Sequence, residues 1–245
     1  MVSLLETTAL IGVSAIPALS AGLFMGYRTR KGLGPQGQHI LDTVAAGVIV
    51  WFFLDVMSES AFLGVNQGPS GSPSQILLAG LFPLGLVAMV YLDKQSDFRW
   101  RLDPSYLAAV AIGLHAMSEG VVIGSGLAPA SGVLAAFGGI RPAESFVTHK
   151  ILEGFALSMF LASPNASRKA LVSVLVAGLP TVLGGAVGLT FSPNSSFFFA
   201  LSGGAALWLL SQLLQKSLSA SNRVLWAISL STGLLLMYSA ALLHS

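Results

Sequence analysis

The chain has 245 residues, of which 54% are hydrophobic and only 9% are charged, and its net charge is +2. Soluble domains have roughly a quarter of their residues charged, so this composition excludes an ordinary water-facing surface and favours a lipid-facing one. Lys and Arg do not cluster with aromatic residues, which leaves nucleic-acid binding without support, and the absence of cysteine excludes disulfides and thiolate ligands.

Long apolar runs are the dominant pattern. A helix needs about 20 largely apolar residues to cross roughly 30 Å of hydrocarbon. The first run lacks the basic start of a signal peptide, so we expect it to remain in the mature protein as a spanning helix. Eight such runs follow in chain order: residues 3–26, 40–62, 74–93, 104–127, 142–163, 170–191, 197–216 and 222–243. They predict an all-α integral membrane protein with one polytopic domain over 1–245.

The basic residues indicate the orientation of these spans. Most of them follow the odd-numbered spans: Arg28, Arg30, Lys31, Lys94, Arg99, Arg101, Arg168, Lys169, Lys216 and Arg223. The even-numbered loops and both termini hold only Arg141. Because positive charge favours the cytoplasmic side, we expect both termini outside, with the cell membrane as the location.

Seven ionisable residues lie inside the spans rather than at their ends. Each costs at least ~2.5–3.5 kcal/mol at mid-membrane, so such residues normally face a partner or a cavity. They are Asp55, Glu59, His115, Glu119, His149, Lys150 and Glu153. We therefore expect a functional site among them.

Four of the seven residues form a repeated motif. His115 to Gly120 and His149 to Gly154 each read H-x-x-x-E-G, so each His and Glu lie one turn apart on one helix face. The two spans run in opposite directions, and adjacent packing would gather two imidazoles with the carboxylates of Glu119 and Glu153. This mixed nitrogen and oxygen set suits a divalent transition metal, with zinc, iron, manganese, cobalt or cadmium as candidates.

The paired motifs on adjacent spans, within eight spans, resemble the ZIP (Zrt/Irt-like) family of divalent metal transporters. In that family, helix four typically carries H-N-x-P-E-G, and helix five carries H-E-x-P-E-G or H-K-x-P-E-G. The resemblance implies a metal site of His115, Glu119, His149 and Glu153, with the metal as substrate and no cofactor. It also implies a homodimer, a 3+2+3 arrangement with inverted repeats, and elevator-like alternating access.

Two positions differ from the usual donors of the family. Ala116 replaces the motif's Asn, and Lys150 stands where many members place a carboxylate for a second metal ion. Ser118 and Leu152 replace the motif prolines. We expect the Lys150 ammonium to neutralise neighbouring carboxylates and to repel a second cation. The alternative is that Lys150 faces away and extends its ammonium to the outer interface.

Asp55 and Glu59 form a second acidic pair, four residues apart in the second span. We interpret them as part of the path by which cations reach the main site. A cluster that only holds helices together by hydrogen bonds is the alternative interpretation.

Two other functions compete with metal transport, for which we expect no enzymatic activity. A metal-dependent hydrolase of the membrane would commonly use an H-E-x-x-H helix, and this chain has none. A proton-coupled carrier of a non-metal substrate is the second alternative, because buried His, Glu and Lys can relay protons.

Overall fold

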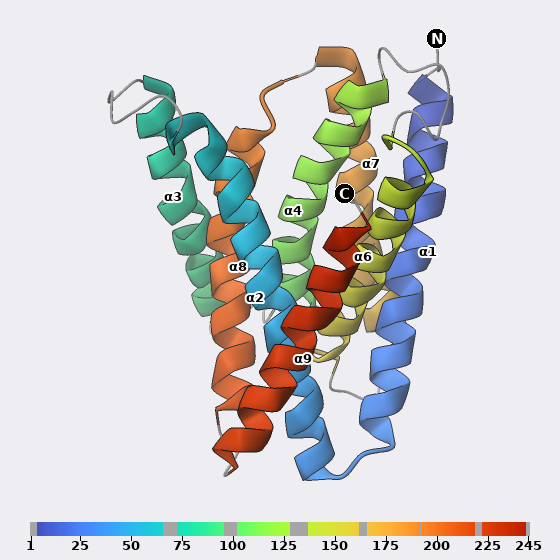
Figure 1. Cartoon of the computed structure of the whole chain (residues 1–245), viewed down its shortest axis with the longest axis vertical. Coiled ribbons are helices and arrows are strands. Elements are labelled where there is room, and N and C mark those ends of the chain that lie inside the picture. Colours follow the sequence, from blue (N-terminus) through green and yellow to red (C-terminus); the bar gives the residue numbers. More distant parts are fainter. Residues whose placement is uncertain are drawn as a thin grey trace.

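A computed structural model describes residues 4–65, 73–95, 102–127, 137–161, 166–191, 193–218 and 222–243. Within these ranges the chain is almost entirely helical, and successive helices alternate in direction along one bundle (Figure 1). The eight helices are α1 (Leu4–Lys31), α2 (Pro35–Val65), α3 (Pro73–Gln95), α4 (Pro104–Leu127), α6 (Ile140–Ser158), α7 (Ala166–Phe191), α8 (Ser196–Ser217) and α9 (Arg223–Leu242). The all-α class predicted from the apolar runs is confirmed.

Six of the described helices are long and apolar enough to cross a membrane: α1, α2, α4, α7, α8 and α9. Helix α6 differs because its 19 residues include four charged ones, Arg141, Glu144, Lys150 and Glu153. Many large apolar side chains on the outside of the bundle, such as Phe24 and Leu235, are more than half exposed. Lipid is the solvent that suits such a surface, so the chain is a membrane-spanning helical protein.

The helix ends extend beyond several of the expected spans. Helix α4 covers 104–127 as expected, but α1 continues to Lys31 and α2 begins at Pro35. The last turn of α1 carries three basic residues, which interact favourably with the negative end of a helix dipole. Proline suits the first position of a helix, because its missing N–H would have no partner there. Hydropathy marks only the part of a helix that can lie in hydrocarbon.

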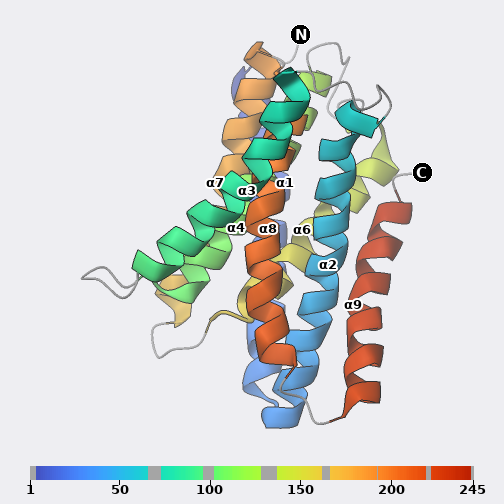
Figure 2. The ribbon, with the colours of Figure 1, turned by 90° about the vertical axis from the view of Figure 1, so that its left-hand side faces the viewer.

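The helices pack as two groups. In the first group, α4 packs on α7, and α1 packs on α6 and α7. In the second group, α8 packs on α2 and α3, and α2 packs on α9. Figure 1 shows the second group on the left and the first on the right, and the view turned by 90° shows α3, α8, α2 and α9 in front (Figure 2). The groups meet mainly through α4 and α8, with smaller contacts of α6 on α2 and α9.

Glycines explain the tight packing within the first group. A Cβ atom built on Gly154 would lie 2.1 Å from the carbonyl oxygen of Leu19, and one on Gly120 would lie 2.1 Å from that of Thr181. Both glycines directly follow the glutamates of the H-x-x-x-E-G motifs. The last residue of each motif therefore lets α6 approach α1 and α4 approach α7 at backbone distance.

The second group uses the same kind of contact. A Cβ on Gly47 of α2 would meet the Leu230 carbonyl of α9 at 2.1 Å, and one on Gly204 of α8 would meet the Phe82 carbonyl of α3 at 2.0 Å. These glycine contacts join helices of the same group, and the contacts within each group are more extensive than those between the groups. Each group is therefore more tightly held within itself than to the other.

The glycine contacts predict a clear difference between two Gly→Ala substitutions. Gly154→Ala should lower the free energy of unfolding by at least about 1–3 kcal/mol, because its methyl group overlaps the α1 backbone. Gly80→Ala is the matched control, since no atom lies within 4 Å of a Cβ there. It should leave stability unchanged or raise it by up to ~1 kcal/mol through helix propensity. Thermal unfolding in one detergent measures both, and equal stability of the two variants would contradict the packing.

Candidate metal site

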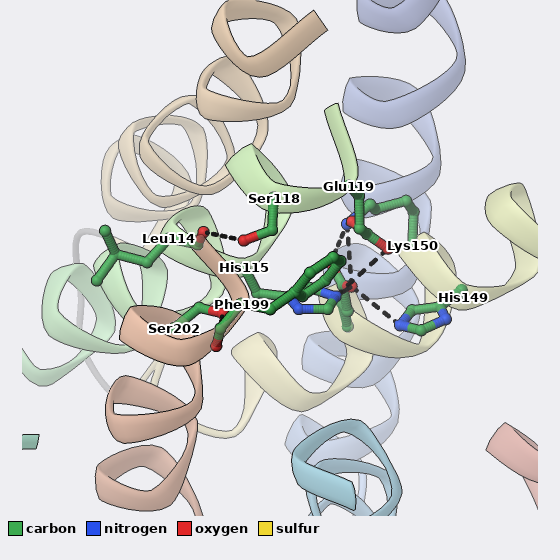
Figure 3. Close-up of polar contacts among 9 residues, drawn as sticks. Leu114, His115, Ser118, Glu119, His149, Lys150, Phe199 and Ser202 are labelled. Atoms are coloured by element: carbon green, nitrogen blue, oxygen red, sulfur yellow. Dashed lines mark hydrogen bonds and ion pairs between the residues drawn. The ribbon is translucent and has the colours of Figure 1, made fainter. Parts of the chain in front are cut away.

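The two motifs meet where α4 faces α6. His115 and Glu119 come from α4, and His149 and Glu153 come from α6. One ligand atom from each of these four residues lies within 4.8 Å of all the others. Figure 3 shows the side chains converging on one another from the two helices. The sequence prediction that these four residues lie together is therefore supported by the packing of the helices.

Glu153 lies at the centre of the cluster. Its Oε1 atom is 3.2 Å from Nε2 of His149 and 3.8 Å from Nε2 of His115. The same His115 nitrogen is 3.4 Å from Oε1 of Glu119. The two imidazole rings are nearly parallel, at 13°, with centroids 6.0 Å apart. A small shift of these side chains would bring two nitrogens and two oxygens around one cation.

His115 is the member that a purely structural role explains least. Its side chain is only 1% exposed, and neither ring nitrogen has a hydrogen-bond partner among the described residues. The rings of Phe52 and Phe199 lie 4.1 and 5.9 Å from the His115 ring and supply no conventional partner. Leaving such a group unsatisfied costs about 1–3 kcal/mol. Coordination of a cation would satisfy the nitrogen that faces Glu119, so the donor set fits a divalent transition metal.

Lys150 lies inside the same cluster. Its side chain is fully buried, and its Nζ donates to Glu119 and, at 3.0 and 2.8 Å, to both carboxylate oxygens of Glu153. The ammonium also lies 5.6 Å from the ring centroid of Phe146. The alternative in which Lys150 extends to the outer interface is therefore wrong. Ala116 is completely buried, and its methyl group offers no ligand atom.

A cavity of about 380 Å³ leads to the cluster between the two groups of helices. It is lined by Trp51, Asp55, Glu119, Val122, Ile123, Ser145, Phe146, His149, Phe199 and Ala241. Val122 follows Glu119 along α4, and Ser145 precedes His149 along α6, so the cavity extends toward the end where α1 begins. Glu119 and His149 line the cavity, whereas His115 and Glu153 lie behind them and are 1% and 0% exposed.

The acidic pair of α2 is only partly described. Asp55 lines the cavity, where its carboxylate adds negative charge in front of the cluster. The side chain of Glu59 lies outside the described residues. Asp55 therefore lies where a cation entering the cavity would pass it. That cations pass Asp55 and Glu59 on their way to the main site stays a prediction.

Sequence reasoning missed the aromatic neighbours of the site. Phe52 and Phe199 come from α2 and α8 of the second group and pack on His115 of the first. Their position had no distinctive signal, because a phenylalanine in an apolar span suits a lipid-facing surface as well as a site. Only their spacing from charged residues of the same helix, such as Asp55 three residues after Phe52, hinted at an inward face.

Neither the models of known protein families nor the curated proteins match the chain. What can be stated is that a membrane-spanning helical protein holds a buried His/Glu cluster whose donors are compatible with metal binding.

Metal binding should depend on the cluster residues one by one. Glu119→Ala and His149→Ala each remove one candidate ligand. Replacing a residue that only supports a ligand typically weakens metal binding about 10–100-fold, so each of these variants should weaken Zn²⁺ binding by more than that. His39→Ala, near the start of α2 and outside the cluster, is the matched control and should bind as the unmutated protein does. Titration calorimetry on purified, monodisperse protein measures the affinities. Unchanged affinity in both cluster variants would show that the metal binds elsewhere.

Proposed function

We propose that this protein transports divalent transition-metal ions, zinc foremost, across the cell membrane and that it is a ZIP-like carrier. The observation that carries this proposal is the His/Glu cluster itself, which is buried among membrane-spanning helices at the inner limit of a cavity. Its mixed donors suit Zn²⁺ and, with it, Fe²⁺, Mn²⁺, Co²⁺ or Cd²⁺. Two carboxylates inside the membrane supply the negative charge that makes a divalent cation stable there.

The partial openness of the site favours a carrier over a static metal centre. Structural zinc sites are closed, with four protein ligands shielded from solvent. Here Glu119 and His149 have side chains 15% and 14% exposed, while His115 and Glu153 are almost completely buried. An ion can therefore be received by the outer two residues before all four surround it.

The division into two groups supports alternating access. All four candidate ligands belong to the first group, whereas the cavity is walled by both groups. Glycine-to-carbonyl contacts hold the helices within each group, and bulkier side chains such as Phe52 separate the groups. A movement of the first group against the second would expose the cluster to the other side without breaking the tight contacts. This is the elevator-like movement that the resemblance implies.

The packing also supports eight crossings in a 3+2+3 arrangement with inverted repeats. An inverted repeat would relate α1 to α7, α2 to α8, α3 to α9 and α4 to α6. Under this exchange, the main contacts between helices map onto one another. The contact of α1 with α6 becomes that of α7 with α4, and the contact of α2 with α9 becomes that of α8 with α3. We extend the proposal to termini on the outer side and to a homodimer in the lipid bilayer.

A hydrolase would need a carboxylate free to act as a base toward water. Both glutamates of the cluster are ion-paired with Lys150, through one oxygen of Glu119 and both oxygens of Glu153, and an ion-paired carboxylate is a poor base toward water. This pairing favours ion binding over hydrolysis, so we propose a carrier without enzymatic activity.

Uptake into liposomes tests the proposed transport. Purified protein in vesicles loaded with a zinc-sensitive dye should give saturable Zn²⁺ uptake, and Glu119→Ala and His149→Ala should lower the rate by at least about tenfold. His39→Ala is again the control. Protein that binds Zn²⁺ through the cluster but accumulates none of the five candidate metals would be a static metal protein, and the transport proposal would fail.

Lys150 sets the expected number of ions at one per chain. At about 4 Å and an effective dielectric of about 20, its charge interacts with a neighbouring charge by roughly 4 kcal/mol, which is enough to disfavour a second cation. Lys150→Glu combined with Ala116→Asn replaces the charge with oxygen donors and should raise the bound metal from one ion to two.

Lys150→Met combined with Ala116→Gly is the matched control, because it removes the charge without adding a donor, and it should still bind one ion. Metal counting by mass spectrometry on saturated protein decides between the outcomes. Two ions in the unmutated protein, or no gain in the Lys150→Glu variant, would refute this role of Lys150.

A further inference from the structure

A set of contacts joins the two groups of helices at the end opposite the cavity. Arg30, in the last turn of α1, forms an ion pair with Asp42 of α2. The second guanidinium nitrogen, Nη2, donates to Oδ2 of Asp42 at 3.3 Å, and Nη1 also lies 3.3 Å from Sδ of Met159 at the end of α6. Asp42 is buried, with a side chain only 5% exposed.

Lys216 of α8 reaches the same place from the second group. Its Nζ donates to the backbone carbonyl of Met159 at 3.2 Å and lies 3.9 Å from the ring centroid of Phe160. Carbonyls at the end of a helix lack intrahelical partners and carry partial negative charge, so a cation is stabilised there. The end of α6, which carries two of the metal ligands, is thus held by residues of both groups.

These contacts lie at the end of the bundle opposite to the end at which the cavity opens. The cavity reaches the cluster from the end where α1 begins, whereas Arg30, Asp42 and Lys216 lie where α1 and α8 end and α2 begins. The residues that follow α6 at this end are buried: Met159, Phe160 and Leu161 are each less than 5% exposed. The other ion pairs among the described residues lie within the first group: those at the cluster, and one between Lys169 of α7 and Asp103, which directly precedes α4.

We propose that Arg30, Asp42 and Lys216 form a latch that holds the two groups together at this end and keeps the metal site closed on that side. This inference rests on the proposed movement of the two groups, and it assigns the contact that must break for the opposite side to open. Breaking it separates Arg30 from Asp42 and withdraws Lys216 from the end of α6. Loss of the Asp42 charge would also remove the carboxylate with which Arg30 pairs.

The cysteine-free chain allows a direct test by thiol labelling. Ala45 is fully buried and lies on the face of α2 between Asp42, which pairs with Arg30, and Phe52, which packs on His115. A cysteine introduced by Ala45→Cys therefore reports opening between the groups beneath the latch. Ala177→Cys gives a matched reporter, because Ala177 is equally buried but lies in the contact of α7 with α4, inside the first group.

Each reporter is combined with Asp42→Asn and treated with a small cationic methanethiosulfonate in detergent solution. The latch predicts that Asp42→Asn raises the labelling rate at position 45 by at least about tenfold, since it leaves the Arg30 guanidinium, whose side chain is 20% exposed, without its carboxylate partner. The rate at position 177 should not change. Arg30→Asp together with Asp42→Arg re-forms the pair with its charges exchanged and should restore slow labelling at position 45.

Two results would overturn the latch. The first is an unchanged labelling rate at position 45 in Asp42→Asn. The second is a rise in labelling at positions 45 and 177 together, which would mean that the ion pair stabilises the fold as a whole. Labelling needs no metal and no uptake, so this outcome is separate from the transport assay. A protein that fails to carry zinc can still show the latch, and a zinc carrier can still lack it.

Discussion

The pairing of Lys150 with Glu119 and Glu153 is the interaction on which the site depends. Three charged side chains inside the membrane would each be costly alone, and breaking a buried pair by removing one partner typically costs 3–5 kcal/mol. Here the ammonium contacts both carboxylates where α4 faces α6; Lys150 and Glu153 are fully buried, and Glu119 is 15% exposed to the cavity. The lysine holds the glutamates in position beside the two histidines while no cation is bound. It therefore supports the cluster, and under the proposed function it would limit the cluster to one ion.

The glycines that follow the two glutamates connect this cluster to the packing of the bundle. Gly120 and Gly154 bring α4 onto α7 and α6 onto α1, so the same short motif supplies a ligand and the contact that fixes its helix. The four candidate ligands consequently all lie on helices that are tightly packed within the first group. The second group contributes Phe52 and Phe199 as apolar surfaces against His115, which hold the ring without competing for its nitrogens.

Much of this arrangement could be predicted from the sequence. Hydropathy located the eight helices, and α4 begins and ends at the expected residues, because a run of apolar residues bounded by proline and polar residues has few alternatives. The spacing of His115 and Glu119, and of His149 and Glu153, placed each pair on one helix face, and the four came together in the prediction only on the expectation that the two spans are adjacent.

Other features depend on which helices pack together, and a single sequence does not carry that information. The direction of Lys150 stayed open because a lysine on a membrane helix can turn toward a carboxylate or toward the interface. The pair of Arg30 and Asp42 was missed because Arg30 was assigned to a loop by its charge, whereas α1 continues through Lys31. Phe52 was indicated only by its spacing from Asp55, and Phe199 gave no distinctive signal, since phenylalanine occurs on lipid-facing and buried helix faces alike.

The buried ammonium has an electrical consequence for the proposed cycle. With both glutamates ionised and Lys150 protonated, the cluster carries −1 when empty and +1 with a divalent ion. Moving one elementary charge through 100 mV is worth about 2.3 kcal/mol, and an inside-negative potential would pull the loaded group inward and push the empty group outward. Without the lysine the charges would be −2 and 0, and the potential would act on the empty return alone. Lys150 thus divides the work done by the membrane voltage between the two halves of the cycle.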